Sequence, residues 1–111
     1  MSDKDTEMLK SHVLHIVKTI EEGYLSEDEE NEGEIISAYD YLSDVLDIEY
    51  IVNSKKEYLG ARVLVAFGGP NIWINTRTQQ VEGYWWGSQS IWGYSSDAMG
   101  LDDALQDLYN C

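Results

Sequence analysis

The chain has 111 residues, a length typical of one domain, and 43% of them are hydrophobic, which is enough for a buried core. Its 21 acidic residues outnumber 7 Lys and Arg, so the formal net charge is −14. This charge argues against binding to free nucleic acid or to an anionic membrane, both of which require cationic side chains, and favours a basic protein surface as the partner.

Cysteine content and the N-terminal segment bear on the cellular compartment. The single cysteine, Cys111, excludes an internal disulfide and fits a reducing cytoplasm. Residues 1–5 lack the basic and apolar segments of a secretory signal, and no stretch approaches the roughly eighteen apolar residues of a membrane span. We therefore expect a cytoplasmic protein without a transmembrane segment. The sequence leaves the oligomeric state open, with a dimer among the options.

Two helices are predicted in the first half of the chain. The first runs from about Lys4 to Glu22, ends at Gly23, and has apolar residues on one face at Leu9, Val13, Ile16, Val17 and Ile20. The segment from Tyr24 to Glu34 is dominated by Glu and Asp and is predicted to be a mobile acidic loop. The second helix runs from about Glu34 to Asp47, with its apolar face at Ile35, Ala38, Tyr39, Leu42, Val45 and Leu46.

Short β-like segments joined by turn residues follow, at Ile48–Asn53, Ala61–Phe67, Asn71–Asn75 and Val81–Trp86. Residues Ile91–Tyr94 either extend the last of these strands or add one more. Ser96 or Asp97 caps a final helix, whose apolar face is Leu101, Ala104, Leu105 and Leu108. The predicted fold class is α+β, a single domain over residues 1–111 with two N-terminal helices, a four-stranded antiparallel meander and one C-terminal helix.

The acidic residues are concentrated between Glu21 and Glu49, where the chain has no Lys and no Arg. Within the second predicted helix, Asp40, Asp44 and Asp47 would share one face, although like charges four residues apart destabilise a helix. Such a stripe could mimic a phosphate backbone, with further charges from Glu30, Glu32, Glu34, Asp103 and Asp107. The alternative interpretation is a solvated surface that serves solubility.

Aromatic residues gather in the predicted sheet, where all four Trp lie between Trp73 and Trp92. Because neighbouring residues of a strand point to opposite faces, Trp85 and Trp86 cannot both be covered by helices on one face. If exposed, Trp73, Tyr84 or Trp86 would anchor a protein interface, since Trp and Tyr dominate binding hot spots. An exposed Trp/Tyr face of the sheet is therefore the alternative binding surface.

Metal and catalytic signatures are weak. Placing Gly33 at the sixth position of an EF-hand loop leaves Tyr39 at the twelfth, where a bidentate carboxylate is needed, so a calcium loop is not predicted. His12 and His15 have helical spacing that could share a metal, but no third ligand is evident. We find no nucleophile elbow, P-loop or dinucleotide fingerprint. The sequence predicts no metal, no cofactor and no enzymatic activity.

Two segments carry a resemblance to other proteins. Residues 68–76 (GGPNIWINT) and 81–87 (VEGYWWG), with the acidic end at residues 101–109, resemble a pattern in small proteins of phages and mobile elements. Small acidic single-domain phage proteins are similar in type to anti-CRISPR and anti-restriction inhibitors, many of which act as DNA mimics. The resemblance implies an inhibitor that occupies the basic channel of a host defence nuclease complex, either a CRISPR effector or a restriction enzyme.

Overall fold

The computed structural model describes residues 3–23, 37–85 and 87–111. Its helices are α1 (Asp3–Glu22), α2 (Ala38–Ser43) and α3 (Leu101–Asn110). Its strands are β1 (Asp47–Val52), β2 (Tyr58–Ala66), β3 (Asn71–Asn75), β4 (Gln80–Trp85) and β5 (Ser88–Gly93). The α+β class is confirmed, and α1 matches the first predicted helix closely.

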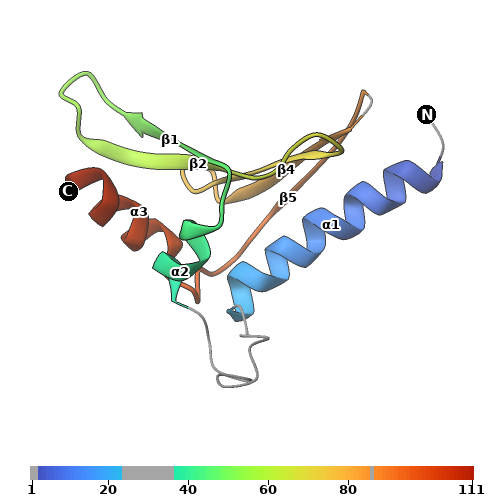
Figure 1. Cartoon of the computed structure of the whole chain (residues 1–111), viewed down its shortest axis with the longest axis horizontal. Coiled ribbons are helices and arrows are strands. Elements are labelled where there is room, and N and C mark those ends of the chain that lie inside the picture. The colour runs from blue at the N-terminus through green and yellow to red at the C-terminus, as the bar shows by residue number, and fades with distance from the viewer. Residues whose placement is uncertain (1–2, 24–36, 86) are drawn as a thin grey trace.

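The strands form one antiparallel sheet in the order β1-β2-β3-β4-β5, and the three helices lie on the same side of it (Figure 1). The predicted count of four strands is wrong, because residues 88–93 form a complete fifth strand paired with β4. Trp85 and Ser88 lie opposite each other, and Gly87 just before Ser88 has φ of 83°, a conformation that favours glycine. None of the helices in the described parts of the chain combines the length and apolar character of a membrane span.

The second predicted helix is much shorter than expected. Ser37 caps α2 by accepting the backbone N–H of Asp40, and the helix ends at Ser43 rather than at Asp47. The N–H of Asp44 closes the last turn on the carbonyl of Tyr41, and the N–H of Leu46 already donates to Leu64 of β2. Pairing with the sheet therefore ends the helix before the third aspartate. The predicted start of this helix at residue 34 lies outside the described residues.

The core lies between the sheet and the helices. Its fully buried side chains come from α1 (Leu9, Val13, Ile20), from the central strands (Val63, Ile72, Ile74, Val81) and from α3 (Leu101, Leu105). The strand alternation predicted for residues 71–75 is confirmed, since Ile72 and Ile74 are buried while Trp73 between them points to the opposite face. Helix α1 covers β4 and β5, and α3 covers β2, so the helices divide the sheet between them.

Helix α3 begins at a carboxylate cap. The side chain of Asp97 accepts three backbone N–H groups, from Gly100 at 2.9 Å, Leu101 at 2.9 Å and Asp102 at 3.0 Å. The predicted N-cap position at Ser96 or Asp97 is wrong, because the N-cap residue is Gly100, and Asp97 supplies its carboxylate from three residues before it. Satisfying these amides fixes the direction in which α3 leaves the sheet.

The C-terminal end of α1 is tied to the segment that leads into α3. Glu21 Oε2 accepts the N–H of Ser95 at 2.7 Å and the hydroxyl of Ser95 at 2.8 Å. The backbone adds a further link, because the N–H of Ala98 donates to Ile20. These hydrogen bonds hold the pKa of Glu21 below its ordinary value of 4.5. A lowered pKa means that Glu21 stabilises the fold above pH 4.5 and loses this effect as the pH falls through the folded value.

Replacing Glu21 by glutamine is therefore expected to lower the urea midpoint at pH 7, and the difference from wild type should narrow as the pH falls below 4.5. The matched control is Glu22→Gln, which removes a neighbouring charge held only by an exposed 3.9 Å ion pair with Lys18. Urea unfolding followed by circular dichroism between pH 3 and pH 7 makes the comparison. Identical pH profiles for the two variants would contradict a special role for the Ser95 contact.

Candidate functional site

Helices α2 and α3 lie against each other and join two acidic segments that are distant in sequence. The hydroxyl of Tyr39 in α2 donates to Asp107 Oδ2 in α3 at 2.5 Å, between residues 68 positions apart. This hydrogen bond, together with the nearby negative charge, raises the pKa of the Tyr39 phenol. Asp40, in the first turn of α2, and Asp44, at its C-cap, therefore belong to a helix that packs beside the helix carrying Asp103 and Asp107. We call Asp40, Asp44, Asp103 and Asp107 the α2–α3 acidic surface.

None of the carboxylates of this surface has a Lys, Arg or His nitrogen within 4.0 Å among the described residues. All four side chains are exposed. Within residues 6–23, 37–85 and 87–111, ion pairs within 4.0 Å join Lys18 to Glu22 and Arg62 to Glu49 and Glu82. The four aspartates of the α2–α3 acidic surface belong to none of these pairs. Their charge therefore remains available to a basic partner.

The predicted helical stripe of Asp40, Asp44 and Asp47 is wrong in its geometry. Asp40 lies in α2 and Asp44 caps it, but Asp47 is the first residue of β1. There its Oδ1 accepts the N–H of Ile48 at 2.9 Å, and Leu64 of β2 lies opposite in the sheet. Asp103 and Asp107 lie on α3, which packs against the helix of the first two aspartates, whereas Asp47 belongs to the sheet. The acidic residues Glu30, Glu32 and Glu34, the predicted mobile loop and Trp86 lie outside the described residues.

The face of the sheet that the helices leave uncovered has an arginine at its centre. Arg62 Nη2 lies 3.0 Å from Glu82 Oε1, and Arg62 Nη1 lies 3.6 Å from Glu49 Oε1. The guanidinium also lies over the ring of Trp73, 4.3 Å from its centroid. Because Glu49, Arg62, Trp73 and Glu82 come from four consecutive strands, this group ties the open face together across β1 to β4.

The remaining bonds of Glu82 come from its neighbours on the same face. The amide of Asn75 donates to Glu82 Oε2 at 3.4 Å, and the hydroxyl of Tyr84 donates to Glu82 Oε1 at 3.2 Å. Burial, and then the charge of Glu82, raise the pKa of the Tyr84 phenol. The side chain of Glu82 is 12% exposed. Because the Glu82 carboxylate is mostly buried, leaving its charge without hydrogen-bond donors would lower the stability of the fold, and these neighbours supply the donors.

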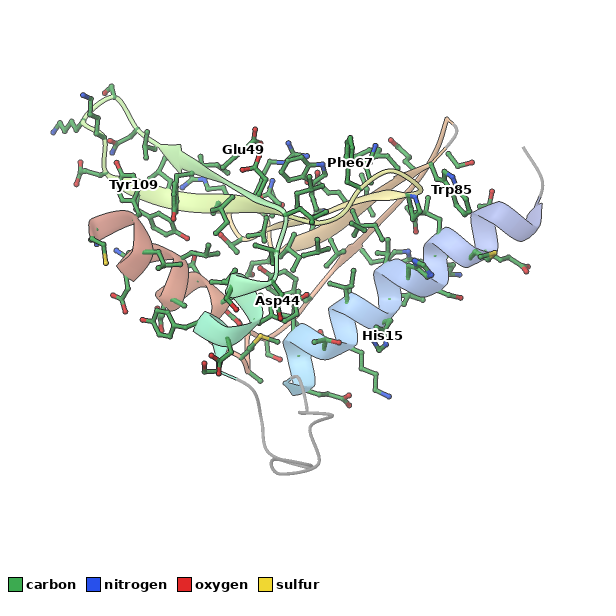
Figure 2. The ribbon with its side chains drawn as sticks, in the orientation of Figure 1. His15, Asp44, Glu49, Phe67, Trp85 and Tyr109 are labelled. Atoms are coloured by element: carbon green, nitrogen blue, oxygen red, sulfur yellow. The ribbon has the colours of Figure 1, made fainter. Side chains whose placement is uncertain are left out.

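Two of the three predicted aromatic anchors lie on this uncovered sheet face, which we define by Arg62, Trp73, Glu82, Tyr84 and Ile91. Trp73 and Tyr84 are half-buried there, and Ile91 is 41% exposed. Figure 2 shows Glu49 and Phe67 on the side of the sheet away from the helices, and Phe67 is 72% exposed. Trp85, by contrast, lies on the side of the sheet that faces α1 (Figure 2).

Several residues that shape these surfaces were not singled out from the sequence. From the sequence, Tyr39 belongs to the apolar face of a predicted helix and to the rejected EF-hand alignment, and Arg62 belongs to a predicted continuous apolar strand. A signal for Arg62 does exist, since it is a cation inside the otherwise apolar segment 61–67. Three tyrosines join α3 to the β1–β2 hairpin, with ring centroids 5.2 to 6.5 Å apart, and no sequence pattern predicts their contact: Tyr50, Tyr58 and Tyr109.

Metal-binding groups do not assemble in the described parts of the chain. No cluster of three or more His, Cys, Asp or Glu side chains in those parts has the arrangement needed to hold a metal ion. His12 and His15 are exposed on α1, and His15 is labelled on that helix in Figure 2. The candidate sites are the two surfaces described above, the α2–α3 acidic surface and the uncovered sheet face. Comparison with models of protein families, with curated proteins and with solved structures finds no match for this chain.

Proposed function

We propose that this protein is a binding protein without catalytic activity that occupies the Lys- and Arg-lined nucleic-acid channel of another protein. The observation that carries the proposal is the α2–α3 acidic surface. It holds four exposed carboxylates on two adjoining helices, without a cation within ion-pair distance among the described residues. The negative charges of these carboxylates repel one another, and binding of a basic partner would reduce that repulsion.

The overall charge supports the same class of partner. With a net charge of −14, the protein would be steered toward a basic channel and away from nucleic acid itself. Exposed carboxylates on a helical scaffold can stand in for phosphate groups against Lys and Arg side chains. The resemblance to small acidic phage proteins makes a host defence nuclease complex, either a CRISPR effector or a restriction enzyme, the partner that we propose. In this role the protein is an inhibitor that acts in the host cytoplasm.

Neutralising the α2–α3 acidic surface tests the proposal. The variant Asp40→Asn/Asp44→Asn/Asp103→Asn removes three charges and leaves Asp107, which holds Tyr39, in place. The matched control Glu7→Gln/Glu22→Gln/Glu57→Gln removes three exposed charges elsewhere. Each protein is immobilised, and a host lysate is passed over it in a salt series, with and without competing DNA or RNA.

We expect wild type and the control to capture a nucleic-acid-binding protein that competitor displaces, with affinity falling at least about tenfold from low to high salt. The Asn variant should capture little of it. Capture that resists both salt and competitor, or that is equal in the Asn variant, would contradict the acidic-channel proposal.

The uncovered sheet face is a second candidate because Trp73 and Tyr84 lie together on it beside Arg62. If this face binds the partner, the acidic charge serves solubility and the Asn variant captures normally. Trp73→Ala then abolishes capture, since a large aromatic side chain at the centre of an interface supplies much of its binding energy. The two candidates thus give opposite results with the same pair of variants.

A further inference from the structure

The two edges of the sheet differ in how they are protected against further pairing. Edge strand β1 carries Asp47 and Glu49, and its register with β2 shifts between Ile51 and Val52. Charges and bulges of this kind are the usual protection of an edge, because they prevent the free N–H and C=O groups from pairing with another strand. The β1 edge is therefore protected against pairing with another strand.

Edge strand β5 has neither form of protection. Its sequence, residues 88–93 (SQSIWG), contains no charged residue and no proline, and all six of its residues are in continuous register with β4. In the described part of the chain, β5 pairs with β4 alone. Every second residue of such a strand directs its N–H and C=O outward, so this edge is open to another strand.

Apolar side chains flank the β5 edge on both faces of the sheet. Ile91, opposite Glu82, lies on the uncovered face, and Trp92, opposite Val81, lies on the helix side; each is 41% exposed. On α1, Lys10 places its Nζ 5.1 Å from the centroid of the Trp92 ring. Leu14, one helical turn after Lys10 on the same ridge, is 37% exposed. A strand added to β5 would cover apolar surface above and below the sheet.

The distribution of charge indicates what this added strand is. The net charge of −14 repels a second copy, but β5 itself has no charged residue, and the cation of Lys10 lies over its Trp92. The acidic surface lies on α2 and α3, and α3 packs on β2, whereas α1 packs on β4 and β5. Two copies joined through β5 would keep their acidic surfaces at opposite ends. A neutral strand is also complementary to itself under twofold symmetry, and it offers no charge with which to select a foreign strand.

We propose that the protein forms a homodimer in which β5 of one protomer pairs antiparallel with β5 of its partner, about a twofold axis near Ile91. The sheet then continues across both protomers, and Ile91, Trp92 and Leu14 become covered. Because screening weakens the repulsion between two acidic protomers, salt strengthens this association. That is the opposite of the salt effect expected for a basic partner, so the dimer and the acidic-channel function can fail independently.

Sedimentation equilibrium of the wild type and two edge variants tests the dimer. Ile91→Lys places a charge on the β5 edge. The matched control Val52→Lys places a charge on the β1 edge, at a side chain that is 39% exposed. Wild type and Val52→Lys should shift from monomer toward dimer up to about 500 μM, and more strongly at about 0.5 M NaCl. Ile91→Lys should weaken the association at least about tenfold while its circular dichroism spectrum stays unchanged.

Hydrogen exchange of the wild-type protein provides a second test of the dimer that needs no variant. The outward amides of β5 should exchange more slowly as the protein concentration rises, whereas those of β1 should not change. A wild type that stays monomeric at the highest concentration and salt would overturn the proposal. So would equal loss of the dimer in both Lys variants, or concentration-dependent protection that appears in β1 instead of β5.

Discussion

Replacing Gly83 by alanine is expected to lower the free energy of unfolding by about 2 kcal/mol, although alanine ordinarily suits a strand better than glycine. A Cβ atom at this position would lie 2.6 Å from Val13 Cγ2 and 2.9 Å from Leu9 Cδ1. Both contacts belong to α1 side chains that are fully buried in the core, so neither can turn away into solvent. The added methyl group therefore requires Val13 and Leu9, or the helix that carries them, to shift within the core.

Two further variants separate this effect from a general response to alanine. Gly69→Ala adds a methyl group that meets nothing within 4 Å, and it should leave stability within about 0.5 kcal/mol of wild type. Val13→Ala removes the atom that clashes, so Gly83→Ala should cost less in that background than in the wild type. Urea unfolding monitored by tryptophan fluorescence measures the wild type, the three single variants and the Val13→Ala/Gly83→Ala double variant. Strict additivity of the two substitutions would show that Val13 does not limit the space at Gly83.

The second large effect is expected at Arg62. Replacing it by methionine keeps much of the side-chain volume but removes both ion pairs and the contact with Trp73. The carboxylate of Glu82 then stays mostly buried with only Asn75 and Tyr84 as donors. We expect a loss of about 2 kcal/mol, because breaking one half of a partly buried ion pair strands the other charge.

A double-mutant cycle identifies the cause of the Arg62 effect. Adding Glu82→Gln to Arg62→Met removes the stranded charge and should restore at least about 1 kcal/mol, while Glu49→Gln, at an exposed pair, should restore almost nothing. Thermal unfolding by calorimetry provides the values. An Arg62→Met/Glu82→Gln protein no more stable than Arg62→Met would mean that the lost packing on Trp73, rather than the charge of Glu82, accounts for the effect.

The elements that the sequence predicts well are those with local, strongly periodic patterns. Helix α1 has one apolar face over about three turns, from Leu9 to Ile20, and β3 alternates without interruption, so the sequence predicts the bounds of both within a residue or two. The second predicted helix is longer than the helix in the structure, and the reason is a contact made outside its own segment. Leu46 donates to Leu64, and this pairing with β2 competes with the helix for the segment that contains Asp47. Asp is also a poor helix former, which leaves little to resist that competition.

Strand β5 was predicted only in outline, because Ser88, Gln89 and Ser90 lack the apolar alternation of a typical strand. What makes these residues a strand is pairing with β4, which their own composition does not reveal. The candidate sites share this limitation. The acidic composition indicated a charged surface, but the link between Tyr39 and Asp107 spans 68 positions, and no local pattern predicts it. The bonds that join Arg62 to strands on either side of β2 are likewise visible only in the folded sheet.

The strand order described above also bears on how the protein folds. Every strand pairs with its neighbour in sequence through a short turn, so the sheet can form with little loss of loop entropy. Helix α1 lies far from β4 in the sequence. The surface at Gly83 on which α1 packs forms only after β4 has joined the sheet. Docking of α1 is therefore expected after the rate-limiting step. The penalty of Gly83→Ala should then fall on the unfolding rate, so that the variant folds as fast as the wild type but remains folded for a shorter time.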